Sequence, residues 1–533
     1  MQLLKYTIST LLVSLSLIAH SQKIEPRNKY VKDFTYLIDK LKETHIDPYG
    51  GFGGKEEFKI ETLKAYSMLT NNITLDEFTT ITNQFLSHLE DGHTHINSKS
   101  QRLSSTLPIK LESAFDHIFI SKSDKKHQSY IGHYILKING IKIEQWLDKV
   151  HKYRPAENIY GDRLHLIEII ENENLSKTFF GCNKTISLTL CNANHVLKKH
   201  KFHYGCGFHI IERTSCLDIT LNNNLIQTGI INPRNPTGYF KWNSMVSREV
   251  IQHAYNRSPK TIENYLSWAY NIMKTRRNGD INIDMNNIPS LYDNFCHLLE
   301  QMKQCKSKNL IIDLSENRGG MTPLIRPLLY LLYGDHYLKY HFNAKMCRKI
   351  SPLYLRKIGC NSIQSYNQSH HQHYQLGEIV CDNFGSFDPS TPLKERRQQV
   401  LKGYHEIGKN ILTNAKVNKG VHIYVITSPR TFSAAFHFMY FMKRLGRTTI
   451  VGVPSSQSPN AFMESTPFCL PNTELKGTIS NSQQILYPMK SDKVKVLHPD
   501  IPIDWDHYRR YSFSTDTPIS KIIDIINTKR TSN

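Results

Sequence analysis

Ser433 lies where a strand-like segment gives way to a helical pattern, and a hydroxyl in that position can act as a nucleophile. Residues 421–427 alternate apolar side chains as a strand does, and residues 434–445 have helical spacing. A serine at such a junction lies beside the first N–H groups of the helix, which can stabilise a forming oxyanion. An ordinary N-cap serine occupies the same position. This segment alone leaves both interpretations open.

A pair of glycines supplies the second element of the same chemistry. Residues 309–314 read as a buried strand, and a polar turn then leads to Gly319 and Gly320. Paired glycines adopt positive φ and let backbone N–H groups approach a substrate closely, although they are also common in plain turns. If this turn meets the Ser433 turn, N–H groups near Gly319, Gly320 and Ala434 would form an oxyanion hole. The chain would then be a serine hydrolase.

A serine nucleophile needs a base near neutral pH, and histidine is the usual one. The chain has 26 histidines, and most histidines are simply polar surface residues. His93 stands out because the sequence DGHTH places it on a glycine turn between two segments of different pattern. We therefore take His93 as the candidate base.

The histidines at 370, 371 and 373 form a second cluster. They could bind a metal, but no carboxylate or cysteine lies at ligand spacing. A solvated loop is the favoured interpretation, so no metal and no cofactor are predicted.

The segment before His93 is expected to be a helical unit, residues 22–100. Apolar residues recur at helical spacing from Val31 to Leu41, from Phe58 to Leu69 and from Leu75 to Leu89. Thr74 with Glu77 three residues later is typical of a capping box. The unit ends at the turn that contains His93.

Residues 105–215 have a different pattern. Alternating segments predict strands, and residues 130–150 read as strand, Asn139-Gly140 turn, short strand and helix. This order resembles the carboxylate-binding half of a PDZ-like domain. An unrelated small α/β insertion fits the same pattern.

The remainder, residues 216–533, is expected to be an α/β core. A helix is predicted after Thr322-Pro323, ending at Gly334, and another from Ala434 to Leu445, ending at Gly446. Residues 335–420 are long, polar and aromatic-rich, which indicates an insertion or lid.

The N-terminal segment, the cysteines and the net charge indicate where the protein is located and what it binds. Residues 1–21 have the charged, apolar and small-residue pattern of a signal peptide, so an exported protein without a transmembrane helix is predicted, periplasmic or secreted. Ten cysteines could then pair, and local disulfides are plausible among Cys182, Cys191, Cys206 and Cys216. The net charge of +21 is spread along the chain, which favours an anionic envelope surface over nucleic acid.

The whole constellation resembles the C-terminal processing (tail-specific) peptidase family, and within it the subgroup of the tricorn core and the photoreceptor retinoid-binding protein. The resemblance rests on Asp91–Thr94, on Asp313–Gly320, on the Thr-x-Ser-Ala-Ala turn at 431–435, and on two later turns. The later turns are Leu-Pro-Asn at 470–472 and Pro-Asp-Ile at 499–501.

The resemblance implies a crotonase-like (ClpP-like) β-α spiral core with Ser433 as nucleophile and His93 as base. Part of the family uses a lysine instead, but no lysine lies between Lys443 and Lys476. The glutamate often found near the late Pro-Asp motif is missing. The acid that orients His93 is therefore left open among Asp91, Glu464 and Asp492.

Three functions are compatible with the sequence. The leading hypothesis is an exported serine endopeptidase that cleaves unfolded or C-terminal peptide segments. The second is a catalytically weakened or inactive peptide-binding protein on the same scaffold. The third is a surface protein that binds polyanions.

Overall fold

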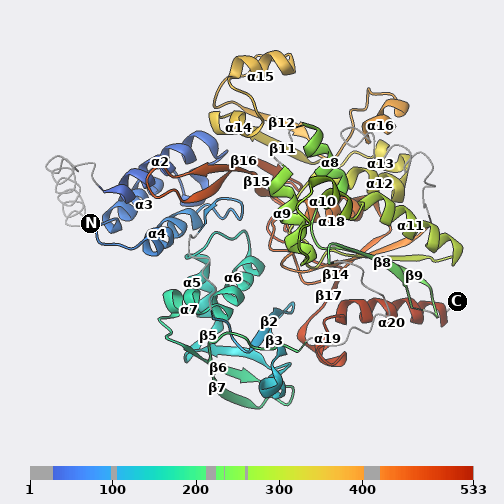
Figure 1. Ribbon diagram of the computed structural model, residues 1–533, viewed down its shortest axis with the longest axis horizontal. Helices are drawn as coiled ribbons and strands as arrows, with labels where there is room; N and C mark the ends of the chain where they lie inside the picture. Colours follow the sequence, from blue (N-terminus) through green and yellow to red (C-terminus); the bar gives the residue numbers. More distant parts are fainter. Residues whose placement is uncertain are drawn as a thin grey trace.

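A six-stranded sheet forms the centre of the C-terminal half and positions the two candidate turns (Figure 1). In this computed structural model the described residues are 28–97, 105–211, 224–232, 234–257, 262–400 and 420–531. The strand order is β17-β14-β13-β10-β9-β8, and neighbours are parallel except for the β8–β9 pair. The strands are β8 Ile226–Ile231, β9 Thr237–Trp242, β10 Asn309–Asp313, β13 His422–Thr427, β14 Thr448–Gly452 and β17 Ile501–Pro502.

Helices cover both faces of this sheet, as a largely parallel sheet requires. Along β10, Leu310 and Ile312 pack into one apolar cluster with helices α11, α12 and α18, while Ile311 packs with α19 and α20 on the other face. The helices of this half are α8 Arg248–Arg257, α9 Ile262–Met273, α10 Ile281–Asn287, α11 Leu291–Gln304, α12 Ile325–Tyr333, α13 Asp335–Lys339, α18 Ala434–Leu445, α19 Trp505–Arg510 and α20 Thr517–Thr531.

The helix ends largely follow the sequence pattern. Helix α18 ends at Gly446 and α12 ends at Gly334, as predicted. The predicted start, with Thr322 as N-cap and Pro323 as the first helical residue, is wrong by two residues, because Thr322–Leu324 forms a 3-10 turn (η4) and α12 begins at Ile325. Pro323 fits this first turn because it needs no hydrogen bond from its nitrogen.

The carboxyl ends of β10 and β13 lie side by side. Asp313 is paired in register with Ile426, and the Leu314 N–H donates to the Ile426 carbonyl at 3.0 Å. The two turns that follow are joined directly, because the Thr431 hydroxyl donates to the Leu314 carbonyl at 2.8 Å. The glycine turn and the serine turn therefore meet in space.

A second sheet includes part of the segment predicted to be an insertion. Its order is β1-β16-β11-β12, and β15 pairs with the other edge of β16. The strands are β1 His95–Ile96, β11 Lys345–Lys349, β12 Ile379–Asn383, β15 Ala461–Cys469 and β16 Lys476–Ile485, with helices α14 Pro352–Lys357, α15 Ile363–His370 and α16 Leu393–Val400 between or after them. Residues 335–400 therefore extend this sheet in addition to covering the core.

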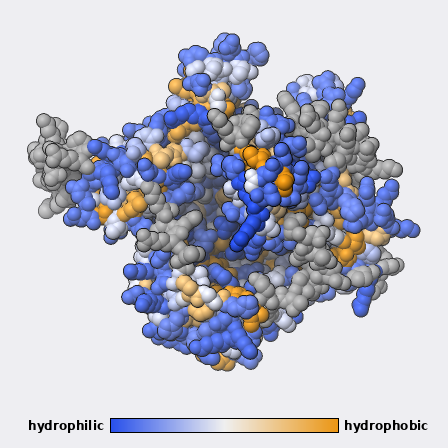
Figure 2. Space-filling view, viewed as in Figure 1, coloured by the Kyte–Doolittle hydropathy of each residue, from blue (hydrophilic) through white to orange (hydrophobic). Residues whose placement is uncertain are grey.

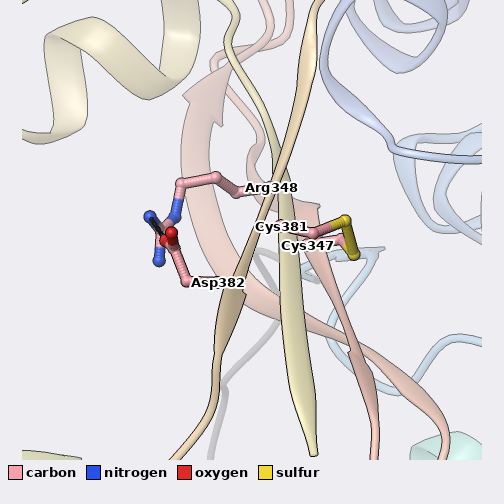
Figure 3. The surroundings of a disulfide bond; sticks show 4 residues. All are labelled: Cys347, Arg348, Cys381 and Asp382. Atoms are coloured by element: carbon pink, nitrogen blue, oxygen red, sulfur yellow. Dashed lines mark hydrogen bonds and ion pairs between the residues drawn. A yellow bond between two sulfur atoms is a disulfide. The ribbon is translucent and has the colours of Figure 1, made fainter. Parts of the chain in front are cut away.

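A disulfide joins Cys347 and Cys381, which face each other across β11 and β12 (Figure 3). Neighbouring residues point to the opposite face, where Arg348 and Asp382 form an ion pair at 2.7 Å. The local pairing predicted for the earlier cysteines is wrong for three of them, because Cys182, Cys191 and Cys206 are unpaired. Cys216 lies outside the described residues.

The N-terminal unit is helical, as predicted. It consists of α2 Lys29–Thr44, η1 Gly50–Phe52, α3 Lys55–Met68 and α4 Leu75–Ser87. The capping box of Thr74 and Glu77 is present at the start of α4. The unit packs its apolar side chains against Phe468, Leu470 and Ile479 of the second sheet and its turn.

One buried carboxylate ties this unit to the core. Asp33 of α2 accepts hydrogen bonds from the Asn472 N–H at 2.9 Å, the Asn472 amide group at 2.8 Å and the Thr473 N–H at 2.7 Å. The Leu-Pro-Asn turn at 470–472 and the following Thr473 therefore hold helix α2 in place through Asp33.

The elements of residues 105–211 lie together in the lower part of Figure 1. Their buried apolar side chains form a separate core. The predicted strand, Asn139-Gly140 turn, short strand and helix are all present. The elements are β2 Ile109–Ser113, β3 Ile118–Ser123, η2 Lys125–Tyr130, β4 Tyr134–Ile138, β5 Ile141–Lys142, α5 Ile143–His151, α6 Ile159–Glu171, α7 Glu173–Phe180, β6 Thr185–Cys191 and β7 Leu197–His203. The PDZ-like assignment stays a prediction.

On the face shown in Figure 2, hydrophilic side chains predominate and hydrophobic ones form small separate groups. Among the described helices, none is both long and apolar enough to cross a bilayer. The predicted signal peptide lies outside the described residues.

Replacing Asp33 tests the link between α2 and the core. Asp33→Ala leaves the N–H groups of Asn472 and Thr473 without their acceptor, so we expect a loss of about 2 kcal/mol in the free energy of unfolding. Urea denaturation measures it. The exposed Asp39→Ala on the same helix serves as control and should change stability by less than about 0.5 kcal/mol. Equal stability of the two variants would contradict the role of Asp33.

Candidate active site

Ser433 has a strained backbone and a side chain that does not cap the helix. Its φ is 53° and its ψ is −124°, a combination that non-glycine residues rarely adopt. Although Ser433 occupies the N-cap position of α18, its hydroxyl makes no capping hydrogen bond. Its own N–H donates to the Gln457 Oε1 atom. Strain of this kind is held by surrounding contacts and is common at functional sites.

The glycine turn lies against Ser433. Gly319 has a φ of 91°, and a Cβ added there would lie 2.7 Å from the Ser433 Cβ and 2.6 Å from the Phe432 carbonyl oxygen. Only glycine therefore fits. The neighbouring Gly320 lies against Met245 and Trp268, where a Cβ would also clash.

Two of the three predicted oxyanion donors, the N–H groups of Gly319 and Ala434, differ in availability. The Gly319 N–H donates to Asn317 Oδ1 at 2.8 Å. In this conformation it is therefore already engaged. The Ala434 N–H is at the first position of α18, where the helix has no internal acceptor for it. Of these two, the Ala434 N–H is consequently the donor better placed for an oxyanion.

His93 lies beside the nucleophile turn. Its ring stacks on the ring of Phe432, the residue before Ser433, with centroids 4.8 Å apart. The turn is fixed to the second sheet, because the Thr478 hydroxyl donates to the His93 carbonyl at 2.7 Å. The imidazole is 8% exposed, and neither ring nitrogen has a hydrogen-bond partner in the described part of the chain.

Asp91 holds the shape of this turn. One carboxylate oxygen accepts from the His93 N–H at 2.8 Å, and the other accepts from the Thr94 hydroxyl and contacts His45 Nε2 at 3.2 Å. Burial alone would raise the pKa of Asp91. The His45 contact and the other donors outweigh burial and lower its pKa to about 2. Asp91 therefore acts as a fixed anion that positions the His93 backbone.

The acid beside the His93 ring is Glu157. Its Oε1 atom lies 3.6 Å from His93 Nδ1, and its Oε2 accepts from the Ser458 N–H at 2.7 Å. Glu157 is 4% exposed and lies in the connection between α5 and α6. Of the other two candidates, Glu464 is paired with Lys357 at 3.0 Å and only its charge acts on His93, where it helps to raise the pKa. Asp492 is an exposed neighbour of Ser491.

Sequence reasoning missed Glu157 because it looked for the acid next to His93, at Asp91, and downstream of the nucleophile, at Glu464 and Asp492. A weak signal existed in the sequence. Asn158 follows Glu157 and caps α6 with bonds to the N–H groups of Tyr160 and Gly161. A carboxylate directly before an N-cap was thus visible, but nothing in the sequence placed it near His93.

The charges of His93 and Glu157 shift each other's pKa. Burial raises the pKa of Glu157, although the His93 contact opposes this change. For His93, burial lowers the pKa, but the adjacent Glu157 carboxylate and then Asp91 outweigh it, so the net pKa lies above the ordinary value of 6.5. An imidazolium is therefore favoured in this site, and a neutral base requires a higher pH than usual.

Asp91, His93 and Glu157 are also the group in the described residues that could hold a metal ion, since one donor atom from each lies within 4.8 Å of the others. Asp91 is committed to the turn, and Glu157 to the Ser458 N–H. The absence of a metal or cofactor from the function stays a prediction.

Comparison with known proteins gives one family match and several similar folds. Residues 281–485 match the model of peptidase family S41. No curated protein is significantly similar in sequence. The structure is similar to mature CPAF complexed with lactacystin, with a TM-score of 0.58 and 12% identity, covering 95% of this chain and 99% of that chain.

Two further solved structures are similar to lesser degrees. Mature CPAF has a TM-score of 0.56 at 12% identity, and the similar region covers 93% of this chain and 96% of that chain. The photosystem II D1 C-terminal processing protease has a TM-score of 0.37 at 10% identity, with 90% of this chain and 94% of that chain covered.

The predicted α/β architecture is confirmed, and it is the fold of the S41 proteases. Residues 281–485 thus carry the pattern of peptidase family S41, and this match supports a serine-type peptidase that acts on peptides or proteins. The narrower subgroup and the role of each site residue stay predictions.

Removing the charge of Glu157 tests its pairing with His93. In Glu157→Gln the imidazolium loses its nearest carboxylate, so the pKa of His93 should fall. The acid limb of the pH profile for covalent labelling of Ser433 by a fluorophosphonate should start above pH 6.5 in the wild type. It should move to lower pH in the variant. Glu90→Gln, at a half-buried residue nearby whose carboxylate pairs with Lys495, should leave the limb in place. An unmoved limb in Glu157→Gln would disprove the pairing.

Proposed function

We propose that this protein is an exported serine endopeptidase that hydrolyses peptide bonds in unfolded or C-terminal segments. The observation that carries the proposal is the contact of the His93 ring with Phe432, which brings a buried imidazole–carboxylate pair to the residue before Ser433. These groups come from segments 340 positions apart, so their meeting is not a consequence of local structure.

In the proposed reaction, the Ser433 hydroxyl attacks the scissile carbonyl carbon and His93 Nε2 takes its proton. Nε2 is the ring nitrogen that lies away from Glu157, and it has no partner in the described residues. The oxyanion would lie at the Ala434 N–H, where the positive end of the α18 dipole adds stabilisation. His93 would then return the proton to the leaving amine.

Glu157 would hold the imidazole in the reactive tautomer. With its carboxylate on the Nδ1 side, the Nδ1 atom carries a proton and Nε2 is left as the base. The present Nδ1–Oε1 separation of 3.6 Å exceeds a hydrogen bond. Catalytic contacts are often long without substrate and shorten when it binds.

A large cavity supports an extended substrate. A volume of about 540 Å³ lies between residues 105–211 and the core, bordered by β2, by α6 and by the Ser428–Arg430 turn. Strand β2 is at the edge of its sheet. An edge strand has backbone groups that can pair with an unfolded peptide strand.

Export is supported by the disulfide. Disulfides such as Cys347–Cys381 form and persist in oxidising compartments, which include the periplasm and the cell exterior. The signal-peptide pattern of residues 1–21 points the same way.

A non-catalytic peptide-binding protein is the second candidate, and one observation favours it. The Gly319 N–H, which the family resemblance assigns to the oxyanion hole, is engaged by Asn317. If that bond persists with substrate bound, stabilisation of the oxyanion falls to the remaining donors.

A labelling experiment separates the two candidates. The wild type should react covalently with a fluorophosphonate probe and hydrolyse an unfolded protein. Ser433→Ala should lose labelling and at least about a thousandfold of turnover, with an unchanged melting temperature.

The exposed Ser369→Ala is the control and should behave as the wild type. Peptide binding without labelling or turnover in the folded wild type would decide for the binding protein.

A further inference from the structure

A small pocket adjoins the candidate active site, and its walls include the residues that precede each proposed catalytic element. Gly92 precedes the base, Arg318 precedes the glycine pair, and Phe432 precedes the nucleophile; all three line the pocket. Its volume is about 140 Å³. With about 30 Å³ per water-sized group, it accommodates about five heavy atoms. Such a space fits one side chain of a substrate rather than a length of chain.

The charged groups of this pocket are two arginines and one carboxylate. Glu157 is the carboxylate, and it is directed to His93. Arg318 Nη2 lies 3.3 Å from Glu168 Oε1, and Arg430 Nε lies 3.7 Å from Glu316 Oε2. Each guanidinium has five N–H donors, so these single contacts leave most of them available.

The balance of charge around Arg318 favours a further anion. Glu168, its partner, is shared with Arg154 at 3.2 Å, so one carboxylate serves two guanidinium groups. Arg318 is 62% exposed on its side chain and can reorient toward the pocket. A guanidinium with unused donors pairs well with a carboxylate, which can accept two parallel hydrogen bonds.

His165 supplies a polar atom that lacks a partner. It lines the pocket, and its Nδ1 atom is buried without a hydrogen bond in the described residues. Burial and the nearby Arg154 lower the pKa of His165 to about 3, so the ring is neutral. A neutral imidazole can donate through Nδ1, and a buried unpaired nitrogen costs stability that a bound acceptor would recover.

We propose that this pocket binds a carboxylate of the substrate, namely the side chain of an aspartate or glutamate next to the scissile bond, with Arg318 as its main partner. Arg430 and His165 would complete the contacts. The inference rests on the proposed peptidase function, and it defines which peptides that site would select. A free C-terminal carboxylate has the same chemistry and is the other source of such a group. The test below separates a side-chain carboxylate from a terminal one.

Arg318 could instead serve only to hold residues 105–211 to the core through Glu168. A structural role of this kind would reduce the cleavage of every peptide equally. A recognition role would change the ranking of peptides. The experiment therefore compares peptides and does not rely on total activity.

The test uses matched peptides that differ in one residue beside the cleaved bond: Asp against Asn, Glu against Gln, and Lys. Each is made with a free and an amidated C-terminus. We expect kcat/KM about 10- to 100-fold higher for the acidic member of each pair, whatever the terminus. Arg318→Glu should abolish this preference and favour Lys. Arg397→Glu, which breaks a similar surface ion pair with Asp335 far along the chain, should keep the wild-type ranking.

Equal cleavage of Asp and Asn peptides would overturn the proposal, as would a preference that follows the free terminus alone. Loss of rate without a change of ranking in Arg318→Glu would assign Arg318 a structural role and also overturn it. A fluorophosphonate labels Ser433 without using the pocket, so labelling reports separately on the peptidase function.

Binding of the same peptides to Ser433→Ala, measured by fluorescence polarisation, reports on the pocket without turnover. If the wild type neither labels nor cleaves but the acidic peptides still bind more tightly, the peptidase function fails and the pocket stands.

Discussion

The parallel pairing of β10 with β13 is the constraint on which the site depends. Because the register joins Asp313 to Ile426, both strands end at the same edge of the sheet. The turns that follow these strands therefore begin side by side. The Leu314 N–H donates to the Ile426 carbonyl, and the Thr431 hydroxyl donates to the Leu314 carbonyl, so the two turns are held together. A glycine at 319 then becomes obligatory, since any side chain would collide with Ser433. The strained backbone of Ser433 is held by the same contacts.

The imidazole depends on a second, independent attachment. The turn containing His93 belongs to the N-terminal unit, yet it continues into β1, which pairs with β16 at His95–Thr478. Helix α2 is fixed at another point through Asp33. Two attachments define the position of the unit better than one, because a single contact would leave it free to rotate. Precise placement of a base against a nucleophile requires rigid support of this type.

Much of the fold could be predicted, because the spacing of apolar residues and the presence of turn and cap residues depend on local structure. The capping box at Thr74, the Asn139-Gly140 turn and the glycine end of α18 all have local causes and are present. The sequence leaves the meeting of the glycine and serine turns as a condition, and the register of β10 with β13 fulfils it. His93 was placed correctly on a turn, although its neighbours were unknown.

What the sequence could not reveal are contacts between distant segments. Glu157 approaches His93 because residues 105–211 pack beside the N-terminal unit, and no local pattern reports that packing. The cysteine pairing failed for the same reason. Cys182 and Cys191 are close in sequence and share a region of strands, but they remain unpaired, whereas Cys347 and Cys381 are brought together by the register of β11 and β12.

The position of β11 has a consequence for anyone who would shorten this protein. Strand β16 is covered along one edge by β15, and along the other by β1 at Gly477–Thr478 and by β11 at Ser482–Ile485. Deletion of residues 335–420 would remove β11 and leave the edge of β16 at Ser482–Ile485 without a partner strand. Its bare N–H and C=O groups would then be a template for strands of other molecules, so the truncated protein should self-associate.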